Sequence, residues 1–229
     1  MLSSSSQLHR ARLFVFDLDH TLLTCNSSYE FGFFLYQKGY FGWGNLIRCL
    51  SYYACHKWLG TSVESLHRQS FAALFKGRSD QQLRAYSQEF LDKRLTSMIN
   101  PPILELLQEA QKQGHACVIF SGSPDFIIKP IARKWGIEQG SEGTQYQVNE
   151  RGQLSHVSRI MEGTEKANAL KSLLIELNFQ PAEVTAYSDS ILDLPLLQMV
   201  GKVVAVNPDA KLRQACHTYH WSIIEQAKR

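Results

Sequence analysis

The chain has 229 residues, of which 44% are hydrophobic and 20% are charged, which is the composition of an ordinary globular protein in water. Its net charge is only +3 and its basic residues are scattered, so the composition gives no indication of a nucleic-acid partner. The five cysteines lack zinc-type spacing, and their odd number favours a reducing, cytoplasmic setting. Because no apolar run approaches the about 20 residues of a membrane helix, we expect no transmembrane segment. A peripheral membrane contact and the oligomeric state stay open.

Residues 13–23 combine a short apolar run with two aspartates, Asp17 and Asp19. A run of Leu, Phe and Val is typical of a strand buried on both faces of a parallel sheet, where carboxylates are unfavourable. The aspartates are therefore expected where the strand leaves the sheet, the edge at which open α/β folds bind ligands. Side chains two positions apart in extended chain share a face. The alternative is an Asp-rich turn whose side chains bond nearby backbone N–H groups.

Residues 26–99 differ from the flanking chain, because they are rich in helix formers and aromatic side chains. Ten of the 25 aromatic residues lie between Tyr29 and Tyr53. Helical spacing predicts one helix over residues 62–75, and Ser79-x-x-Gln82 resembles a capping box that begins another. The aromatic residues favour helix packing in a small subdomain over a substrate-binding surface.

Strands and helices alternate after Asn100-Pro101-Pro102, where the prolines suit the first turn of a helix. The predicted elements are a helix over 103–113, a strand over 116–120, a helix over 125–135, a hairpin over 146–158, a helix over 166–177, a strand over 184–187, a short helix over 194–199 and a strand over 203–206. This order predicts an α/β fold, a Rossmann-like parallel sheet flanked by helices, with a helical cap inserted after the first strand. Residues 1–25 and 100–229 would form the catalytic core, and residues 26–99 the cap.

Polar residues follow three of the predicted strands and begin one helix. They are Asp17 and Asp19 after the first strand, Ser121, Gly122 and Ser123 after the second, Asp189 and Asp193 after the strand at 184–187, and Lys166 at the start of the preceding helix. Carboxylates from two strand ends form a hard oxygen donor set that suits Mg²⁺. A lysine and a hydroxyl nearby suit a phosphoryl group.

This set resembles the haloacid dehalogenase-like phosphohydrolase superfamily. The four motifs of the superfamily are matched by Asp17-Leu18-Asp19-His20-Thr21, by Ser121, by Lys166 in GTEK, and by Asp189 and Asp193 in YSDSILDLPLL. The match covers about residues 12–206 and is most similar to the phosphoserine-phosphatase-like branch, subfamily IB. It implies a phosphatase that uses Mg²⁺ and an aspartyl-phosphate intermediate.

Each motif residue then has an expected role. Asp17 would be the nucleophile, and Asp19 would act first as acid and then as base. The metal-binding set would be Asp17, Asp19 through its backbone carbonyl, Asp189 and Asp193, with Asp193 acting on metal-bound waters or on Lys166. The phosphate-binding set would be Ser121, Gly122, Lys166 and Thr21, with the Thr21 hydroxyl bracing the turn by a local hydrogen bond.

Structural alternatives exist for each residue. Lys166 could be a solvated helix residue, Ser121 a helix cap, and Asp189 and Asp193 surface charges at helical spacing. We interpret His20 as a structural turn residue, because the motif tolerates varied residues there.

The substrate is left open by one departure from the phosphoserine phosphatases. Those enzymes carry a glutamate that reads the substrate ammonium where this chain has Asn26, and Arg68 is a loose counterpart of their carboxylate-reading arginine. We therefore expect a small-molecule or lipid phosphate monoester rather than phosphoserine. Two alternative functions are a phosphotransferase and a catalytically silent, phosphate-binding regulatory protein.

Overall fold

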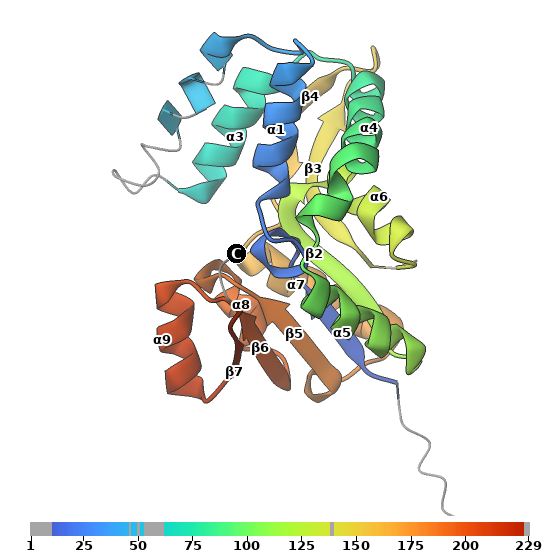
Figure 1. Ribbon diagram of the computed structural model, residues 1–229, viewed down its shortest axis with the longest axis vertical. Coiled ribbons are helices and arrows are strands. Elements are labelled where there is room, and N and C mark those ends of the chain that lie inside the picture. Colours follow the sequence, from blue (N-terminus) through green and yellow to red (C-terminus); the bar gives the residue numbers. More distant parts are fainter. Residues whose placement is uncertain (1–10, 46, 50, 53–61, 138–139, 227–229) are drawn as a thin grey trace, which may run out of the picture.

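Seven strands form one sheet in the computed structural model, which describes residues 11–45, 47–49, 51–52, 62–137 and 140–226. They are β1 (Leu13–Phe16), β2 (Ala116–Pro124), β3 (Glu142–Val148), β4 (Leu154–Arg159), β5 (Val184–Ser188), β6 (Lys202–Val206) and β7 (Ser222–Ile224). Their order is β4-β3-β2-β1-β5-β6-β7, and every neighbouring pair is parallel except β3 with β4 (Figure 1). The predicted α/β fold with a Rossmann-like sheet is confirmed.

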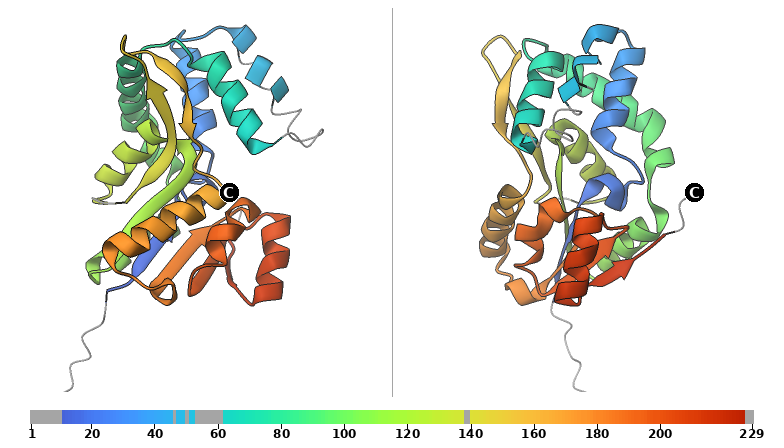
Figure 2. Two further views of the ribbon diagram at one scale, coloured as in Figure 1. Left: turned by 180° about the vertical axis from the view of Figure 1, so that it is seen from behind. Right: turned by 90° about the vertical axis from the view of Figure 1, so that its left-hand side faces the viewer.

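Both faces of the central strands are buried, which explains the apolar run in β1. Phe16 contributes to a core that also holds residues of α5 (Pro101–Lys112) and α6 (Asp125–Lys134). Leu13 and Val15 point into a second core shared with α7 (Thr164–Leu177), α8 (Leu194–Leu197) and α9 (Ala210–Tyr219). Views from opposite sides show α5 over one face of the sheet and α7 over the other (Figures 1 and 2). Side chains that alternate between two covered faces favour strand over helix here.

An inserted segment follows β1 before α5 leads back to β2. Its described helices include α1 (Ser27–Gln37), α3 (Val63–Leu74) and α4 (Asp80–Met98), and these lie beyond the carboxyl ends of the central strands (Figure 1). The outgoing and returning segments run side by side, because Leu23 pairs with Ile99 in an antiparallel bridge and the Thr24 N–H donates to the Met98 carbonyl over 2.8 Å. The segment between these residues is thus inserted between β1 and the helix α5 that precedes β2.

The inserted helices also contact the β3–β4 hairpin. The Gly77 N–H donates to the Leu154 carbonyl over 2.8 Å, and the Leu154 N–H donates to the Arg78 carbonyl over 2.9 Å. The turn between α3 and α4 therefore continues the edge of the hairpin. This pairing joins residues far apart in the sequence, and no local pattern predicted it.

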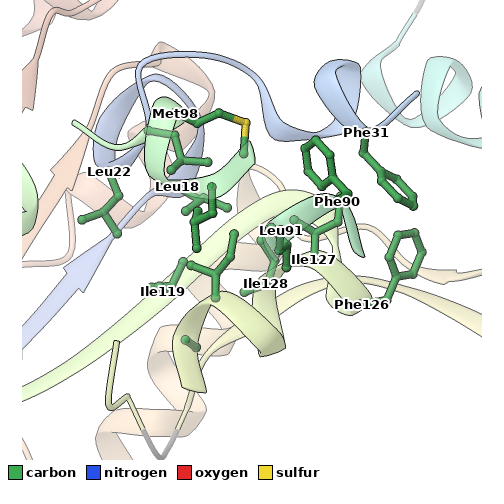
Figure 3. Packing of buried hydrophobic residues seen from close by; sticks show 14 of the residues in the cluster. Leu18, Leu22, Phe31, Phe90, Leu91, Met98, Ile119, Phe126, Ile127 and Ile128 are labelled. Atoms are coloured by element: carbon green, nitrogen blue, oxygen red, sulfur yellow. The ribbon is translucent and has the colours of Figure 1, made fainter. Parts of the chain in front are cut away.

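One apolar core runs from the turn after β1 into the inserted helices (Figure 3). It contains Leu18 and Leu22 after β1, Phe31 of α1, Phe90 of α4 and Phe126 of α6. The predicted helix-packing role of the aromatic cluster is confirmed for its buried members, Phe31, Phe34, Tyr40 and Phe41. Others lie at the surface, namely Tyr29, Phe33 and Trp43, whose exposed fractions are 61%, 51% and 63%. Tyr53 lies outside the described residues.

Several element boundaries differ from those expected. β2 extends to Pro124, so Ser121, Gly122 and Ser123 belong to the irregular carboxyl end of the strand rather than to a loop. α7 begins at Thr164, two residues before Lys166. α9 and β7 were not predicted. β7 has only three residues and little apolar alternation, so it carries no clear strand pattern. None of the helices in the described part of the chain is long and apolar enough to cross a membrane.

Candidate active site

The chain turns sharply after β1 and places two aspartates at the sheet edge. The Asp17 N–H still donates to the Tyr187 carbonyl of β5 over 2.9 Å, which makes Asp17 the last residue held by the sheet. The helical turn η1 (Leu18–Leu22) follows, and it is interrupted at Asp19, whose ψ of 132° is extended, and at His20, whose φ is 58°. A left-handed residue with an exposed side chain agrees with the interpretation of His20 as a turn residue.

A buried lysine joins the first and fourth motifs. Lys166 Nζ donates to Asp17 Oδ1 over 2.6 Å and to Asp193 Oδ2 over 2.9 Å, and Ser188 Oγ donates to the same Asp193 oxygen over 2.7 Å. Burial alone would lower the pKa of Lys166, but the two carboxylates outweigh it and hold the pKa above its usual range. Lys166 is therefore a fixed positive charge beside Asp17, not a solvated helix residue.

Negative charge exceeds positive charge around Asp17. Burial raises the pKa of the Asp17 carboxyl well above its usual range, and although Lys166 opposes this rise, Asp193, Asp189 and Asp19 add to it. Burial, with Asp193 as the next cause, raises the pKa of Asp189 to about 7. Because four carboxylates surround one lysine in a buried site, a further cation would balance the remaining negative charge.

The acidic residues fit a divalent cation only in part. Among the described residues, no three acidic, histidine or cysteine side chains converge into a ready-made metal cluster. Asp193 Oδ2 already accepts hydrogen bonds from Lys166 and Ser188. The Asp19 carboxylate accepts a hydrogen bond from Ser123. The carboxylates of Asp17 and Asp189 remain as hard oxygen donors, and this donor chemistry suits Mg²⁺.

The Asp19 carboxylate is held by hydroxyl and amide donors. Its Oδ1 accepts from the Ser27 N–H at the start of α1 over 2.6 Å, and its Oδ2 accepts from Ser123 Oγ over 2.5 Å and Ser121 Oγ over 3.3 Å. The Ser121 hydroxyl thus lies beside the acid rather than in a helix cap. The first and second motifs meet at this point, as the resemblance implied.

Gly122 is enclosed by groups that a side chain would displace. A Cβ on Gly122 would lie 2.4 Å from Glu162 Oε1 and 2.9 Å from Glu162 Cγ, so any larger residue here would displace the Glu162 side chain. Thr144 of β3 fixes this segment from the other side, because its Oγ1 donates to the Gly122 carbonyl over 2.6 Å and accepts from the Met161 N–H over 3.2 Å. The backbone that would meet a phosphoryl group is thereby held in place.

Thr21 differs from the expectation. Its side chain is fully buried, and its Oγ1 has no hydrogen-bond partner among the described residues, so the predicted local bracing bond is wrong. The turn is braced instead by Asn100, whose Nδ2 donates to the Thr21 carbonyl over 2.8 Å.

Other residues of the site were not predicted from the sequence. They are Ser27 and Ser28, whose hydroxyls both contact the Ser123 hydroxyl, Ser188 and Thr144, Glu162 over Gly122, and Asp209, which accepts from the Ile191 N–H over 2.8 Å. The only local signal was the Asn26-Ser27-Ser28 start of α1, which is typical of a helix N-terminus.

Comparison with known proteins places these motifs in one family. The haloacid dehalogenase-like hydrolase family matches residues 14–198, which includes Asp17, Asp19, Ser121, Lys166 and both later aspartates. The chain belongs to this family. The resemblance recognised in the sequence is confirmed.

Relatives of this hydrolase include named phosphatases. It is 33% identical over 214 residues to the phosphoserine phosphatase SerB1 of Mycobacterium tuberculosis, with 91% of this chain and 68% of that protein covered. It is 26% identical over 228 residues to a histidinol-phosphatase of Neisseria meningitidis, with 93% and 97% covered. The prediction of a phosphatase is confirmed at the level of the enzyme class.

Solved structures share the fold at low sequence identity. A protein of unknown function from Bordetella pertussis superposes with a TM-score of 0.82 at 24% identity, covering 93% of this chain and 98% of that one. A substrate-bound phosphoserine phosphatase superposes with a TM-score of 0.70 at 15% identity, covering 95% and 94%. Both alignments include the inserted helices as well as the sheet.

Proposed function

We propose that this hydrolase is a Mg²⁺-dependent phosphomonoesterase that acts through an aspartyl-phosphate on Asp17. The observation that carries the proposal is the pairing of Asp17 Oδ1 with buried Lys166 at 2.6 Å, beside an acid, Asp19, that lies within hydrogen-bond reach of Ser121. A carboxylate is a better nucleophile than water toward a phosphate monoester. The lysine offsets the charge of both reactants as they approach.

Two steps account for turnover. In the first, an Asp17 oxygen attacks phosphorus, the ester P–O bond breaks, and a protonated Asp19 gives its proton to the departing alkoxide. In the second, Asp19 takes a proton from water, which attacks the aspartyl-phosphate and releases inorganic phosphate. The Ser27 N–H and the Ser121 and Ser123 hydroxyls orient the Asp19 carboxyl for both transfers.

Asp17, Asp189 and the backbone carbonyl of Asp19 would hold the metal ion. When bound, Mg²⁺ would neutralise phosphoryl charge and the surplus negative charge of these carboxylates. Asp193 would keep Lys166 in place, with Ser188 as its second partner. Asp209 would support the loop that carries Asp189, because the Asp209 N–H donates to the Asp189 carbonyl over 2.8 Å.

The substrate would be a small-molecule or lipid phosphate monoester other than phosphoserine. Asn26, at the position expected to read an ammonium group, is used as the N-cap of α1, since its Oδ1 accepts from the Tyr29 N–H over 3.0 Å. Arg68 is also engaged, because it donates to Glu64 over 2.9 Å and to the Val157 carbonyl over 3.0 Å. In this conformation Asn26 Oδ1 and two of the guanidinium nitrogens of Arg68 are engaged within the chain.

The inserted segment would act as a helical cap that closes over the site. We assign residues 26–99 to this cap and residues 1–25 and 100–229 to the catalytic core, on the basis of the paired crossing at Leu23 and Ile99. Closure would exclude water from the phosphoryl group during the first step. The cytoplasmic location stays a prediction, in keeping with the free thiols of the four described cysteines, Cys25, Cys49, Cys117 and Cys216.

Hydrolysis of p-nitrophenyl phosphate tests the proposal. Wild-type protein should release nitrophenol with Mg²⁺ present and lose this activity in EDTA, and Asp17→Asn should be inactive while keeping its melting temperature. Turnover that persists in EDTA or in Asp17→Asn would contradict the proposal. Product analysis with added alcohols separates hydrolysis from phosphotransfer, because a transferase would form a new phosphate ester.

A further inference from the structure

The helix α1 carries large apolar side chains on more than one face. Phe31, Phe34 and Leu35 are buried in the core shared with α4 and α6. Tyr29 and Phe33, one helical turn apart, are exposed by more than half. A surface helix normally presents polar side chains on the face that it does not bury. The exposed aromatic residues of α1 therefore need another explanation than the packing of the core.

These side chains belong to one exposed apolar row, which consists of Tyr29, Phe33, Tyr36, Trp43 and Ile47. The ring centroids of Phe33 and Tyr36 are 6.5 Å apart, and those of Tyr36 and Trp43 are 5.8 Å apart. Ile47 lies one helical turn after Trp43 and is 52% exposed. Contiguous apolar side chains at the surface of a globular protein mark a protein–protein or membrane interaction site.

Positive charge accompanies the exposed apolar row. Residues 26–63 contain one acidic residue, Glu30, and three basic residues, Lys38, Arg48 and Lys57. Over the whole insertion, residues 26–99, nine basic residues outnumber five acidic ones, whereas the rest of the chain has 15 basic and 16 acidic residues. The positive net charge of the protein therefore comes from the segment that carries the row.

Basic side chains lie at both ends of the described row. Arg48 directly follows Ile47 and is exposed. Lys38 follows the end of α1 and shares the carboxylate of Glu89 with Lys93, at 2.5 and 2.6 Å, so that two ammonium groups face one acid. The surface around the row thus combines aromatic rings with surplus cations.

We infer that the exposed apolar row docks the inserted helices on an anionic lipid surface. Aromatic side chains are enriched at the membrane–water interface, and basic side chains beside them attract anionic headgroups. The cores of protein–protein interfaces are depleted in lysine, which makes a protein partner the weaker match. The inference concerns binding and does not depend on the proposed phosphatase activity.

Docking through the row would bring the candidate active site close to the lipid headgroups. α1 begins at Ser27, whose N–H donates to Asp19 Oδ1 over 2.6 Å. Phe33 lies six residues further along the same helix, about 9 Å at the usual helical rise. The row lies in the inserted segment, at the opposite end of the molecule from α9 (Figure 1).

Co-sedimentation with lipid vesicles tests the inference. Wild-type protein should bind vesicles of phosphatidylcholine with about 30% phosphatidylglycerol, and should bind pure phosphatidylcholine more weakly. Phe33→Ser and Trp43→Ser should each weaken binding about tenfold or more, the usual effect of losing the burial of one large apolar side chain. Arg48→Gln should weaken it about fivefold, and added salt should act in the same direction.

Ile175→Ser is the matched control, because Ile175 is 84% exposed on α7 of the core and lies outside the row. This variant should bind the vesicles as wild-type protein does. Melting temperatures verify that each variant is folded. Hydrolysis of p-nitrophenyl phosphate without lipid should be the same in wild type, Phe33→Ser and Trp43→Ser, so vesicle binding and the proposed function are tested separately.

Three results would overturn the inference. They are no binding of wild-type protein to the anionic vesicles, equal binding to both kinds of vesicle, and unchanged binding in both Phe33→Ser and Trp43→Ser. A dimer in sedimentation velocity that is lost in these variants, without vesicle binding, would assign the row to a second copy of the chain instead. If the vesicles are bound as expected but no phosphate ester is hydrolysed, the inference stands and the proposed function fails.

Discussion

The carboxyl edge of the sheet and the inserted helices differ in how firmly their side chains are fixed. At the sheet edge, Asp17 and Asp193 share the buried ammonium of Lys166, and Asp19 accepts three hydrogen bonds. In α1, Phe31 is buried while Phe33, two residues on, is 51% exposed. Hydrogen bonds and ion pairs therefore fix the side chains of the proposed reaction site at the edge. The insertion combines a packed core with exposed aromatic side chains.

The largest effect is expected at the sheet edge, from Lys166→Met. Removing the ammonium leaves Asp17 and Asp193 buried without a positive partner and removes charge stabilisation from phosphoryl transfer. We expect kcat/KM for p-nitrophenyl phosphate to fall about 10²- to 10³-fold. Lys171→Met, at an exposed position of the same helix, is the control. A loss below tenfold would show that the lysine does not act on the reaction.

A smaller loss is expected from Gly122→Ala, which tests the contact between the edge and Glu162. The new Cβ would meet Glu162 Oε1 at 2.4 Å and must displace the carboxylate or the strand end. Strain of this kind costs about 1 to 3 kcal/mol, which corresponds to about 5- to 150-fold in kcat/KM when it is borne in the transition state. The double variant with Glu162→Ala should recover part of the loss. Gly32→Ala, where a Cβ meets nothing within 4 Å, should show none.

Within the insertion, Phe31→Ala and Phe33→Ala form a matched pair. Phe31 packs against Phe90 and Phe126 with ring centroids 5.4 and 5.6 Å away, so its loss should lower the free energy of unfolding by about 3 to 5 kcal/mol. Phe33→Ala should change it by no more than about 0.5 kcal/mol. Urea unfolding measures both. Equal destabilisation would mean that the exposed face of α1 is covered.

The smallest effect is a pH dependence of stability set by Asp189. Its pKa is raised to about 7 in the folded protein, so its stabilising contribution is full below the unfolded value of 3.8 and is lost as pH rises through about 7. The metal-free protein should therefore melt at a lower temperature at pH 8 than at pH 5.5. Mg²⁺ should raise the melting temperature more at pH 8, and Asp189→Asn should flatten both trends. A larger Mg²⁺ effect at the lower pH would contradict this assignment.

The sequence was sufficient for most of the sheet edge because three of the motifs combine a buried strand with polar residues at its end. Asp17, Asp19 and Ser121 could be placed together because parallel strands end at one edge, and Lys166, which lies on a helix, was placed there by its position in the motif order. The structure brings Lys166 and Asp17 together across 149 residues. The packing function of the buried aromatic residues in the insertion was also predictable.

The remaining contacts could not be predicted because they join segments distant in sequence without a repeating pattern. The hydroxyl contact of Ser27 with Ser123 spans 96 residues, and the His67 contact with Glu162 spans 95. Thr21 failed as a bracing residue because its buried hydroxyl has no hydrogen-bond partner among the described residues, and an amide 79 residues away braces the turn instead. Such contacts depend on how the insertion sits over the sheet.

Trapping the covalent intermediate tests the central claim most directly. Wild-type protein quenched in acid during turnover of a ³²P-labelled phosphate monoester should carry label on the peptide that contains Asp17, and Asp17→Asn should carry none. Absence of labelled protein throughout steady-state turnover, or label on a peptide that lacks Asp17, would contradict the account.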